Sequence, residues 1–415
     1  MVSSFQLSIY NNRKSLLRDP RTWLALLAFC EKNIVRYALL VLTMITGDAA
    51  ISEFLLGFAY VTLIIACIRK GSRIHATEFL FLISVILAIL VTCVVYPNNT
   101  QFIFDENNFW NSIFPCLRFF LVGLFIIPDK ELSNLLGFVS CFSLLIEGIF
   151  LFAYLKPAGL VESDDMSRSY QILLNVLFIL NTAFNKKKLS WICISIAGLL
   201  YMFSLGTRGP IMILLVFMFL KFIQQSSSKK ATKVIVGFFL GGLLLLLANS
   251  NIYFVFLEFL RSLLDQLGMS TRIVDLAIEG QVIEHTSGRD EIYELAMKKI
   301  HEQPLFGYGV YGEWPWNGWN IHNMYLELLL HFGVVLGSII IAWMLFFTLK
   351  TYFRTTNIIA QEFILMWATI VFIKGIFGGS YLQLHVFLLI GFLFSESKRL
   401  KKYKYDKTSN CSCRL

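Results

Sequence analysis

Three arginines in the sequence lie beside apolar runs or at the start of a predicted helix, where they could bind an anion. Arg208 lies in Leu-Gly-Thr-Arg-Gly-Pro between two apolar runs, and Arg289 stands at the start of a predicted helix, where backbone N–H groups also favour an anion. Arg168 is a third cation next to an apolar run. A guanidinium can contact a phosphate through two donors, and it can also pair with a carboxylate or a lipid headgroup. The arginines therefore predict recognition of an anion near a membrane surface.

A histidine and an aromatic loop add a second candidate chemistry. His322 follows the loop and begins an apolar run, in Asn-Ile-His-Asn-Met-Tyr. A neutral imidazole there could take a proton from a hydroxyl, although a lone histidine is more often structural. Asn323 could orient the ring or the hydroxyl. The rings of Trp316 and Trp319 could lie at a bilayer interface or stack on sugars.

The elements that must position these residues are membrane-spanning helices. Hydrophobic residues make up 57% of the 415 residues and charged residues only 15%, against about 25% charged in soluble domains. The apolar runs approach or exceed the length that crosses a hydrocarbon core of about 30 Å. An all-α integral membrane protein with twelve spans is predicted, near residues 34–47, 54–68, 77–96, 114–127, 135–155, 170–184, 189–205, 210–223, 233–250, 324–349, 360–376 and 381–395. An interfacial helix around 23–29 is an alternative for the first element.

The charges predict an orientation for these spans. Residues 251–321 hold five Lys/Arg and ten Asp/Glu, so this loop carries −5 while the rest of the chain carries +14. The surplus lies in short basic connections, which by the positive-inside rule face the cytoplasm together with both termini. We therefore expect an inner-membrane protein. The first twenty residues are polar and contain no short apolar core before a small-residue cleavage site, so no removable signal peptide is expected. Nucleic acid is not an expected partner, because no basic stripe with interleaved aromatic residues stands on a soluble surface.

The same pattern divides the chain into five segments. These are a cytoplasmic or interfacial segment 1–33, spans within 34–250, an external loop 251–321, spans within 322–395 and a basic tail 396–415. The loop has no cysteine, and leucines at helical spacing predict a helix that ends at Gly268. A second helix is predicted between Ser287, which forms a capping pair with Asp290, and Pro304, with one face formed by Ile292, Leu295, Ala296 and Ile300.

A family resemblance lies in this region. Residues 287–337 read Ser-Gly-Arg-Asp-Glu, then Pro-Leu-Phe-Gly-Tyr-Gly, then Ile-His-Asn-Met-Tyr-Leu, then Phe-Gly-Val-Val-Leu-Gly. This ordered set resembles the signature segment of the bacterial O-antigen polymerase and O-antigen ligase superfamily. Thr207-Arg208-Gly209 is similar to that superfamily's other arginine motif. The detailed match covers about an eighth of the chain.

The resemblance implies glycosyl transfer from an undecaprenyl-diphosphate-linked oligosaccharide, on a metal-independent membrane glycosyltransferase fold of the GT-C-like type. Arg208 and Arg289 would hold the diphosphate, and His322 would activate the acceptor hydroxyl. No metal or other cofactor is expected, since no pattern of paired Asp residues demands a divalent ion. Membrane lipids and a chain-length regulator are candidate partners. The remaining predicted substrate-binding residues are Arg168, Asn323, Tyr325, Trp316 and Trp319. The loop also contains carboxylates that could orient sugars, namely Asp290, Glu291 and Glu313.

Three functions stay open at this point. A polymerase of O-antigen or capsular repeat units is favoured over an O-antigen ligase, because the fuller set of ligase motifs is not found. A lipid-linked oligosaccharide flippase or another transporter would also have about twelve spans. Intramembrane charge is sparse, with Glu147 as one example, and a paired half-repeat would favour transport.

Overall fold

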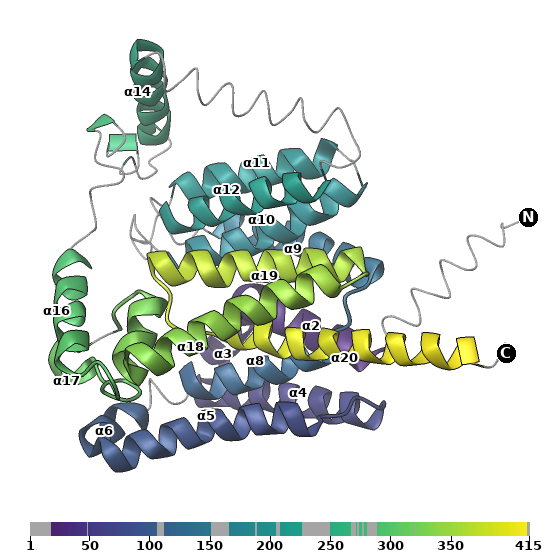
Figure 1. The fold of residues 1–415 in the computed structure, drawn as a ribbon. Helices are drawn as coiled ribbons and strands as arrows, with labels where there is room; N and C mark the ends of the chain where they lie inside the picture. The colour runs from purple at the N-terminus through teal and green to yellow at the C-terminus, as the bar shows by residue number, and fades with distance from the viewer. Residues whose placement is uncertain are drawn as a thin grey trace, which may run out of the picture. The chain divides into compact units, whose positions relative to one another are not determined.

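The structure is a computed structural model that is helical throughout its regular elements (Figure 1). It describes residues 18–47, 49–105, 112–150, 166–186, 189–204, 208–225, 250–266, 289–318 and 320–412, together with 271, 274–275 and 278–279. No strand occurs among these residues, so the predicted all-helical class is confirmed for them. The chain divides into a first unit, Met1–Leu135 with Glu291–Leu415, and a second unit, Leu136–Asp290.

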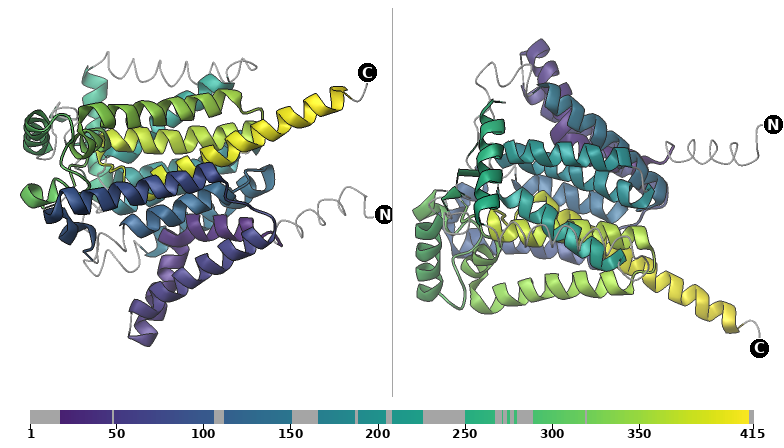
Figure 2. Two further views of the ribbon diagram at one scale, coloured as in Figure 1. Left: turned by 60° about the horizontal axis from the view of Figure 1, so that its bottom comes forward. Right: turned by 90° about the horizontal axis from the view of Figure 1, so that it is seen from above.

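The first unit is a helical bundle built on the close packing of two helices, α8 and α20 (Figure 2). A Cβ on Gly123 would lie 2.3 Å from the Leu388 carbonyl oxygen, and one on Gly391 would lie 2.2 Å from that of Phe120. The two backbones approach this closely because each presents a glycine to the other. The main helices are α2 (Pro20–Cys30), α3 (Arg36–Thr46), α4 (Ala49–Arg69), α5 (Ala76–Val95), α8 (Phe114–Phe125), α18 (Met324–Arg354), α19 (Ile358–Phe377) and α20 (Leu384–Ser412).

Shorter elements complete the first unit. A π-helical turn, η1 (Glu31–Val35), joins α2 to α3, and η2 (Pro97–Asn99) and α6 (Thr100–Ile103) follow α5. α17 (Trp314–Asn317) precedes α18, and α16 (Arg289–Glu302) enters the unit from the second one.

The first described helix, α2, belongs to the bundle. Leu24 in α2 is fully buried, and Phe29 stacks on Trp367 of α19 with ring centroids 5.5 Å apart. Glu31, which interrupts the apolar sequence, forms an ion pair of 2.6 Å with Arg118. This part of the predicted segment 1–33 therefore packs inside the unit, and its position relative to a membrane stays a prediction.

The second unit packs α9 (Lys130–Phe150), which begins in the first unit, with α10 (Met166–Lys186), α11 (Leu189–Ser204) and α12 (Arg208–Gln225). Its interior is partly polar: the Asn175 amide donates to Ser143 Oγ at 3.2 Å, and the Lys221 ammonium donates to Asn181 Oδ1 at 3.1 Å. α14 (Ser250–Gln266) follows, with Leu257 packed in a small cluster. This confirms the helix predicted from the leucine spacing, although its predicted end at Gly268 lies outside the described residues.

Four helices in the described part of the chain are long and apolar enough to cross a membrane: α5, α9, α18 and α19. Shorter apolar helices cover Phe54–Arg69, Phe114–Phe125 and Gly209–Gln224. The predicted span at 233–250 lies outside the described residues. The chain thus has the helices of a membrane protein, and the count of twelve spans stays a prediction.

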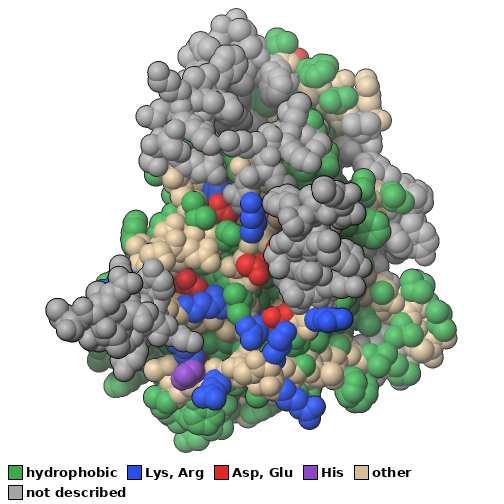
Figure 3. All heavy atoms as spheres, turned by 90° about the vertical axis from the view of Figure 1, so that its right-hand side faces the viewer, with side chains coloured by type: hydrophobic (Ala, Val, Ile, Leu, Met, Phe, Trp, Pro, Cys, Tyr) green, Lys and Arg blue, Asp and Glu red, His purple; other side chains and the backbone are tan. Residues whose placement is uncertain are grey.

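The two ends of the first unit differ in charge. One end is basic: Lys70 pairs with Asp19 at 3.6 Å, Lys398 pairs with Glu78 at 2.5 Å, and Arg399 donates to the Ile126 carbonyl at 2.8 Å. Figure 3 looks onto this end, where Lys and Arg side chains gather. α5 runs from the basic end to the opposite end, where the hydroxyl of Tyr96 reaches the loop before α17. The predicted aromatic loop and His322 therefore lie at the end opposite the basic one.

Candidate functional site

α18 is broken at Gly333, and the break positions the site. Gly333 has φ 75° and ψ 167°, so residues 324–332 form a short helix and the long straight part follows the break. A Cβ on Gly337 would lie 2.7 Å from the Leu328 carbonyl oxygen, which shows the short helix folded back onto the long one. The sequence predicted one continuous span over 324–349. The structure corrects this, because the backbone at Gly333 is one that only glycine adopts readily.

The loop before α17 fills the break through backbone hydrogen bonds. Val334 N–H donates to the Pro304 carbonyl at 2.7 Å, and Tyr308 N–H donates to the Leu330 carbonyl at 2.9 Å. Carbonyls at a helix end have no partner within the helix, and the loop supplies one. Gly307 allows this approach, since a Cβ there would lie 2.4 Å from the Leu330 oxygen. The motif segments around 304–309 and 330–337 therefore form one interlocked structure.

Polar side chains near the end of α5 hold the other side of this loop. Tyr96 donates from its hydroxyl to the Gly307 carbonyl at 2.8 Å, and the Asn99 amide donates to the Tyr308 carbonyl at 2.8 Å. The next loop residues are buried, and burial raises the pKa of the Tyr311 hydroxyl above its usual range. The part of the loop from Gly307 to Glu313 is thus packed, whereas residues 303–306 are exposed.

His322 stands at the entrance to the short helix. It adopts a left-handed backbone conformation with φ 61°, its side chain is half-buried, and its carbonyl accepts from the Tyr293 hydroxyl at 3.4 Å. Asn323 caps α18, because its side-chain oxygen accepts from the N–H groups of Tyr325 at 3.0 Å and Leu326 at 3.2 Å. That oxygen is engaged in the cap, which leaves only the amide nitrogen for the predicted role of orienting the ring or an acceptor.

The other predicted residues of the first unit have packing contacts. Tyr325 donates from its hydroxyl to the Phe372 carbonyl of α19 at 3.0 Å. Trp316 packs against a cluster that includes Ala296 and Ile300 of α16, with Ile292 beside them, which confirms these three residues of the predicted apolar face. Trp319 and the predicted capping residue Ser287 lie outside the described residues.

The predicted arginines gather within the second unit. α10, α11 and α12 are joined by short connections and pack together, so α10 and α12 begin at the same end. Arg168 lies in the first turn of α10, and Arg208 is the first residue of α12. Arg289 begins α16 and lies close enough to Tyr170 of α10 for its charge to act on that hydroxyl. All three arginines therefore belong to one end of the second unit.

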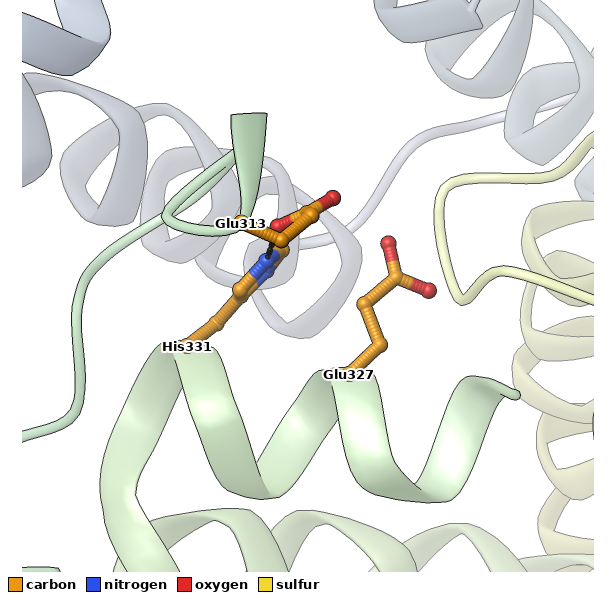
Figure 4. Close-up of side chains that lie close together, drawn as sticks. All are labelled: Glu313, Glu327 and His331. Atoms are coloured by element: carbon orange, nitrogen blue, oxygen red, sulfur yellow. Dashed lines mark hydrogen bonds and ion pairs between the residues drawn. The ribbon is translucent and has the colours of Figure 1, made fainter. Parts of the chain in front are cut away.

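A buried cluster that the sequence did not predict is formed by residues on both sides of His322 in the chain. Figure 4 shows Glu327 and His331, one helical turn apart on the short helix, facing Glu313 from the loop. His331 Nε2 is hydrogen-bonded to the Glu313 carboxylate, and all three side chains are at most 1% exposed. On the outer side, His331 Nδ1 contacts the Tyr381 hydroxyl at 2.8 Å, and Ser380 donates to Glu327 Oε1 at 2.7 Å.

This cluster corrects the view of Glu313 as a loop carboxylate that could orient sugars, since its side chain is fully buried. The Glu-x-x-x-His spacing of Glu327 and His331 is a sequence signal for one helical face. Glu313 could not be joined to that pair from the sequence, because the backbone interlock at the break brings it there. The donor atoms lie within 4.8 Å of one another, so the group could hold a proton or a metal ion.

No family model matches the chain, and comparisons with curated proteins and with solved structures find no similar protein.

Proposed function

We propose that the chain is a membrane glycosyltransferase that joins undecaprenyl-diphosphate-linked oligosaccharide repeat units of an O-antigen or capsular polysaccharide. The observation that carries this proposal is the interlocked structure formed by the resembling segment. Its glycines allow the loop to dock into the break of α18, and Asn323 starts the helix beside His322. The spacing of the motif thus has a structural purpose, which is to hold an imidazole at the end of an apolar helix.

The proposed chemistry assigns separate tasks to the histidine and to the arginines. In the reaction, the acceptor hydroxyl oxygen bonds to the anomeric carbon of the donor sugar, and the bond from that carbon to the diphosphate breaks. His322 takes the hydroxyl proton. The bonding electrons leave with the diphosphate, whose growing negative charge is stabilised by Arg208 and Arg289 through bidentate contacts. Arg168, at the same end of the second unit, adds positive charge for the same anion.

The proposed location follows from the charges of the first unit. Its basic end faces the cytoplasm under the positive-inside rule, which puts the end with the loop and His322 on the external face of the inner membrane. Lipid-linked repeat units that have crossed the membrane are then within reach. A chain-length regulator would be a partner on that face.

Deletion in the native strain tests the proposal, with the surface polysaccharide separated on a gel. A single repeat unit on each core indicates a polymerase, and a core without any repeat unit indicates the ligase or a transporter. Purified protein should also lengthen lipid-linked repeat units without another enzyme. A deletion strain with wild-type polymer would refute the proposal.

Matched variants separate the site from general damage. Arg261, on α14, is exposed and pairs with Asp275 at 2.8 Å, so Arg261→Ala is the control for Arg208→Ala and Arg289→Ala. His301 is exposed on α16, so His301→Ala is the control for His322→Ala. We expect the controls to keep polymerisation.

A further inference from the structure

The buried cluster of Glu313, Glu327 and His331 has no part in the proposed transfer reaction. We propose that it is a structural site for a divalent metal ion, with Zn²⁺ as the cation that its donors fit best. The ligands are the Glu313 carboxylate, Glu327 Oε2 and His331 Nε2. The ion would connect the loop before α17 to the short helix that follows His322.

The charge of the cluster is the first argument. Glu313 and Glu327 are both 0% exposed, and among the described residues only His331 is a basic group paired with either of them. With both carboxylates ionised, a neutral imidazole leaves two negative charges in this interior and a protonated one leaves a single negative charge, so either further protons or a cation must balance the cluster. Unbalanced buried charge is costly. A divalent cation bound to two carboxylates and a neutral imidazole makes the group neutral.

The unused oxygens are the second argument. Within the described part of the chain, Glu313 Oε1 and Glu327 Oε2 are buried and have no hydrogen-bond partner. Buried polar atoms normally have one, so such atoms need an explanation. Both belong to carboxylates that face the same small space as His331 Nε2 (Figure 4). A bound cation would satisfy them.

The spacing of the donors agrees with a metal ion. All donor atoms lie within 4.8 Å of one another, and donors at about 2.0–2.2 Å from one ion lie at most about 4.4 Å apart. Small side-chain rotations close this difference. The hydrogen bond between His331 Nε2 and Glu313 would then be replaced by two metal bonds, so the proton and the ion are alternative occupants.

The side chains around the three ligands hydrogen-bond to them from outside. Metal-bound histidines usually use the other ring nitrogen for a hydrogen bond, and metal-bound carboxylates are also hydrogen-bonded from outside. Here the Tyr381 hydroxyl contacts His331 Nδ1 at 2.8 Å, and Ser380 donates to Glu327 Oε1 at 2.7 Å. Both partners lie in the connection between α19 and α20, so the ligands are held in place by a third segment.

The donor set selects the type of metal and the role. Mg²⁺ and Ca²⁺ prefer oxygen ligands alone, whereas imidazole with carboxylates suits Zn²⁺ and similar transition metals. Three protein ligands leave one position of the Zn²⁺ tetrahedron, which the second oxygen of a carboxylate can fill. All three side chains are buried, so we assign the ion a structural role. The ion therefore fixes the loop and adds stability.

Full-length protein purified in detergent without chelators tests the proposal. We expect equimolar zinc by elemental analysis, a fall in thermal unfolding temperature after chelation, and recovery when Zn²⁺ alone is returned. Neither readout depends on glycosyl transfer, so the result is independent of the proposed function. Wild-type protein that is free of zinc and does not respond to Zn²⁺ would overturn the proposal.

Variants identify the site. Glu327→Gln and His331→Gln should weaken zinc binding by more than about 100-fold, and Ser380→Ala and Tyr381→Phe by about 10- to 100-fold. The control is Glu302→Gln, which alters an exposed carboxylate of α16 paired with Lys299 at 2.7 Å and should leave binding unchanged. Should the ligand variants fail to fold, Ser380→Ala and Tyr381→Phe decide. Zinc affinity in these two variants equal to that of the wild type would contradict the assignment.

Discussion

Replacing Gly333 by alanine should destabilise the chain far more than a matched glycine replacement elsewhere. At φ 75° and ψ 167°, a residue with a side chain is strained by about 1–3 kcal/mol. The new Cβ would also lie 2.2 Å from the Leu305 carbonyl oxygen, which must move. Overpacking of this kind costs about 1–3 kcal/mol. The free energy of unfolding should therefore fall by about 2–6 kcal/mol.

Gly318 provides the matched control for this substitution. It also has a positive φ, 74°, but a Cβ there would meet nothing within 4 Å. Gly318→Ala should therefore cost only about 1–2 kcal/mol, the strain of a left-handed backbone. The entropy that alanine removes from the unfolded chain is common to both variants and cancels in the comparison.

Thermal unfolding of the two purified variants in the same detergent is the assay, followed by size-exclusion chromatography. Gly333→Ala should unfold at a clearly lower temperature than Gly318→Ala, with less folded protein recovered. Equal unfolding temperatures would refute the interlock of the loop with α18. The loop before α17 should also open more often in Gly333→Ala, so limited proteolysis should cleave it faster than in Gly318→Ala.

His322→Ala should leave a folded protein whose polymerisation falls by about 10²- to 10⁴-fold, and wild-type turnover of the purified variant would remove His322 from the mechanism. Arg208→Lys and Arg289→Lys should be impaired like the alanine variants, because lysine keeps the charge but loses the bidentate contact; normal polymer in both would exclude diphosphate binding. A cysteine at position 316 should react with an impermeant reagent in intact spheroplasts, and reaction only after lysis would reverse the orientation. Burial raises the pKa of Tyr311 in the folded state. The stability that the neutral Tyr311 hydroxyl contributes is therefore complete below the unfolded pKa of about 10 and is lost as the pH rises through the folded pKa. Tyr311→Phe should reduce this loss of stability at alkaline pH, as measured by thermal unfolding over a series of pH values.

Local features of the fold could be predicted from the sequence. The helix over Ile292–Ile300 and the leucine-rich helix before Gly268 were predicted from apolar spacing, and α16 and α14 confirm them. The spacing of apolar residues is sufficient to predict such a helix, because its apolar face becomes buried whichever neighbour covers it. The role of Asn323 as a helix cap is also a local property, since its side chain reaches only the next backbone groups.

The break in α18 could not be predicted from the apolar run alone. Glycine is common within membrane helices, so Phe-Gly-Val-Val-Leu-Gly is equally compatible with a continuous span. The backbone turns at Gly333 because the Pro304 and Leu330 carbonyls find N–H partners across the break. These partners come from two segments that are separate in the chain, and hydropathy does not report on them.

The amino-acid sequence by itself determined that this protein is helical, rich in apolar runs and basic at the short connections, because composition and periodicity act over a few residues at a time. Only the tertiary structure brought Glu313 to Glu327 and His331 and buried all three. A glutamate in a sequence is expected to be exposed to solvent, because burying its charge is costly. Glu313 is buried only because the whole loop docks against α18. The chemistry of the cluster is therefore a property of long-range packing.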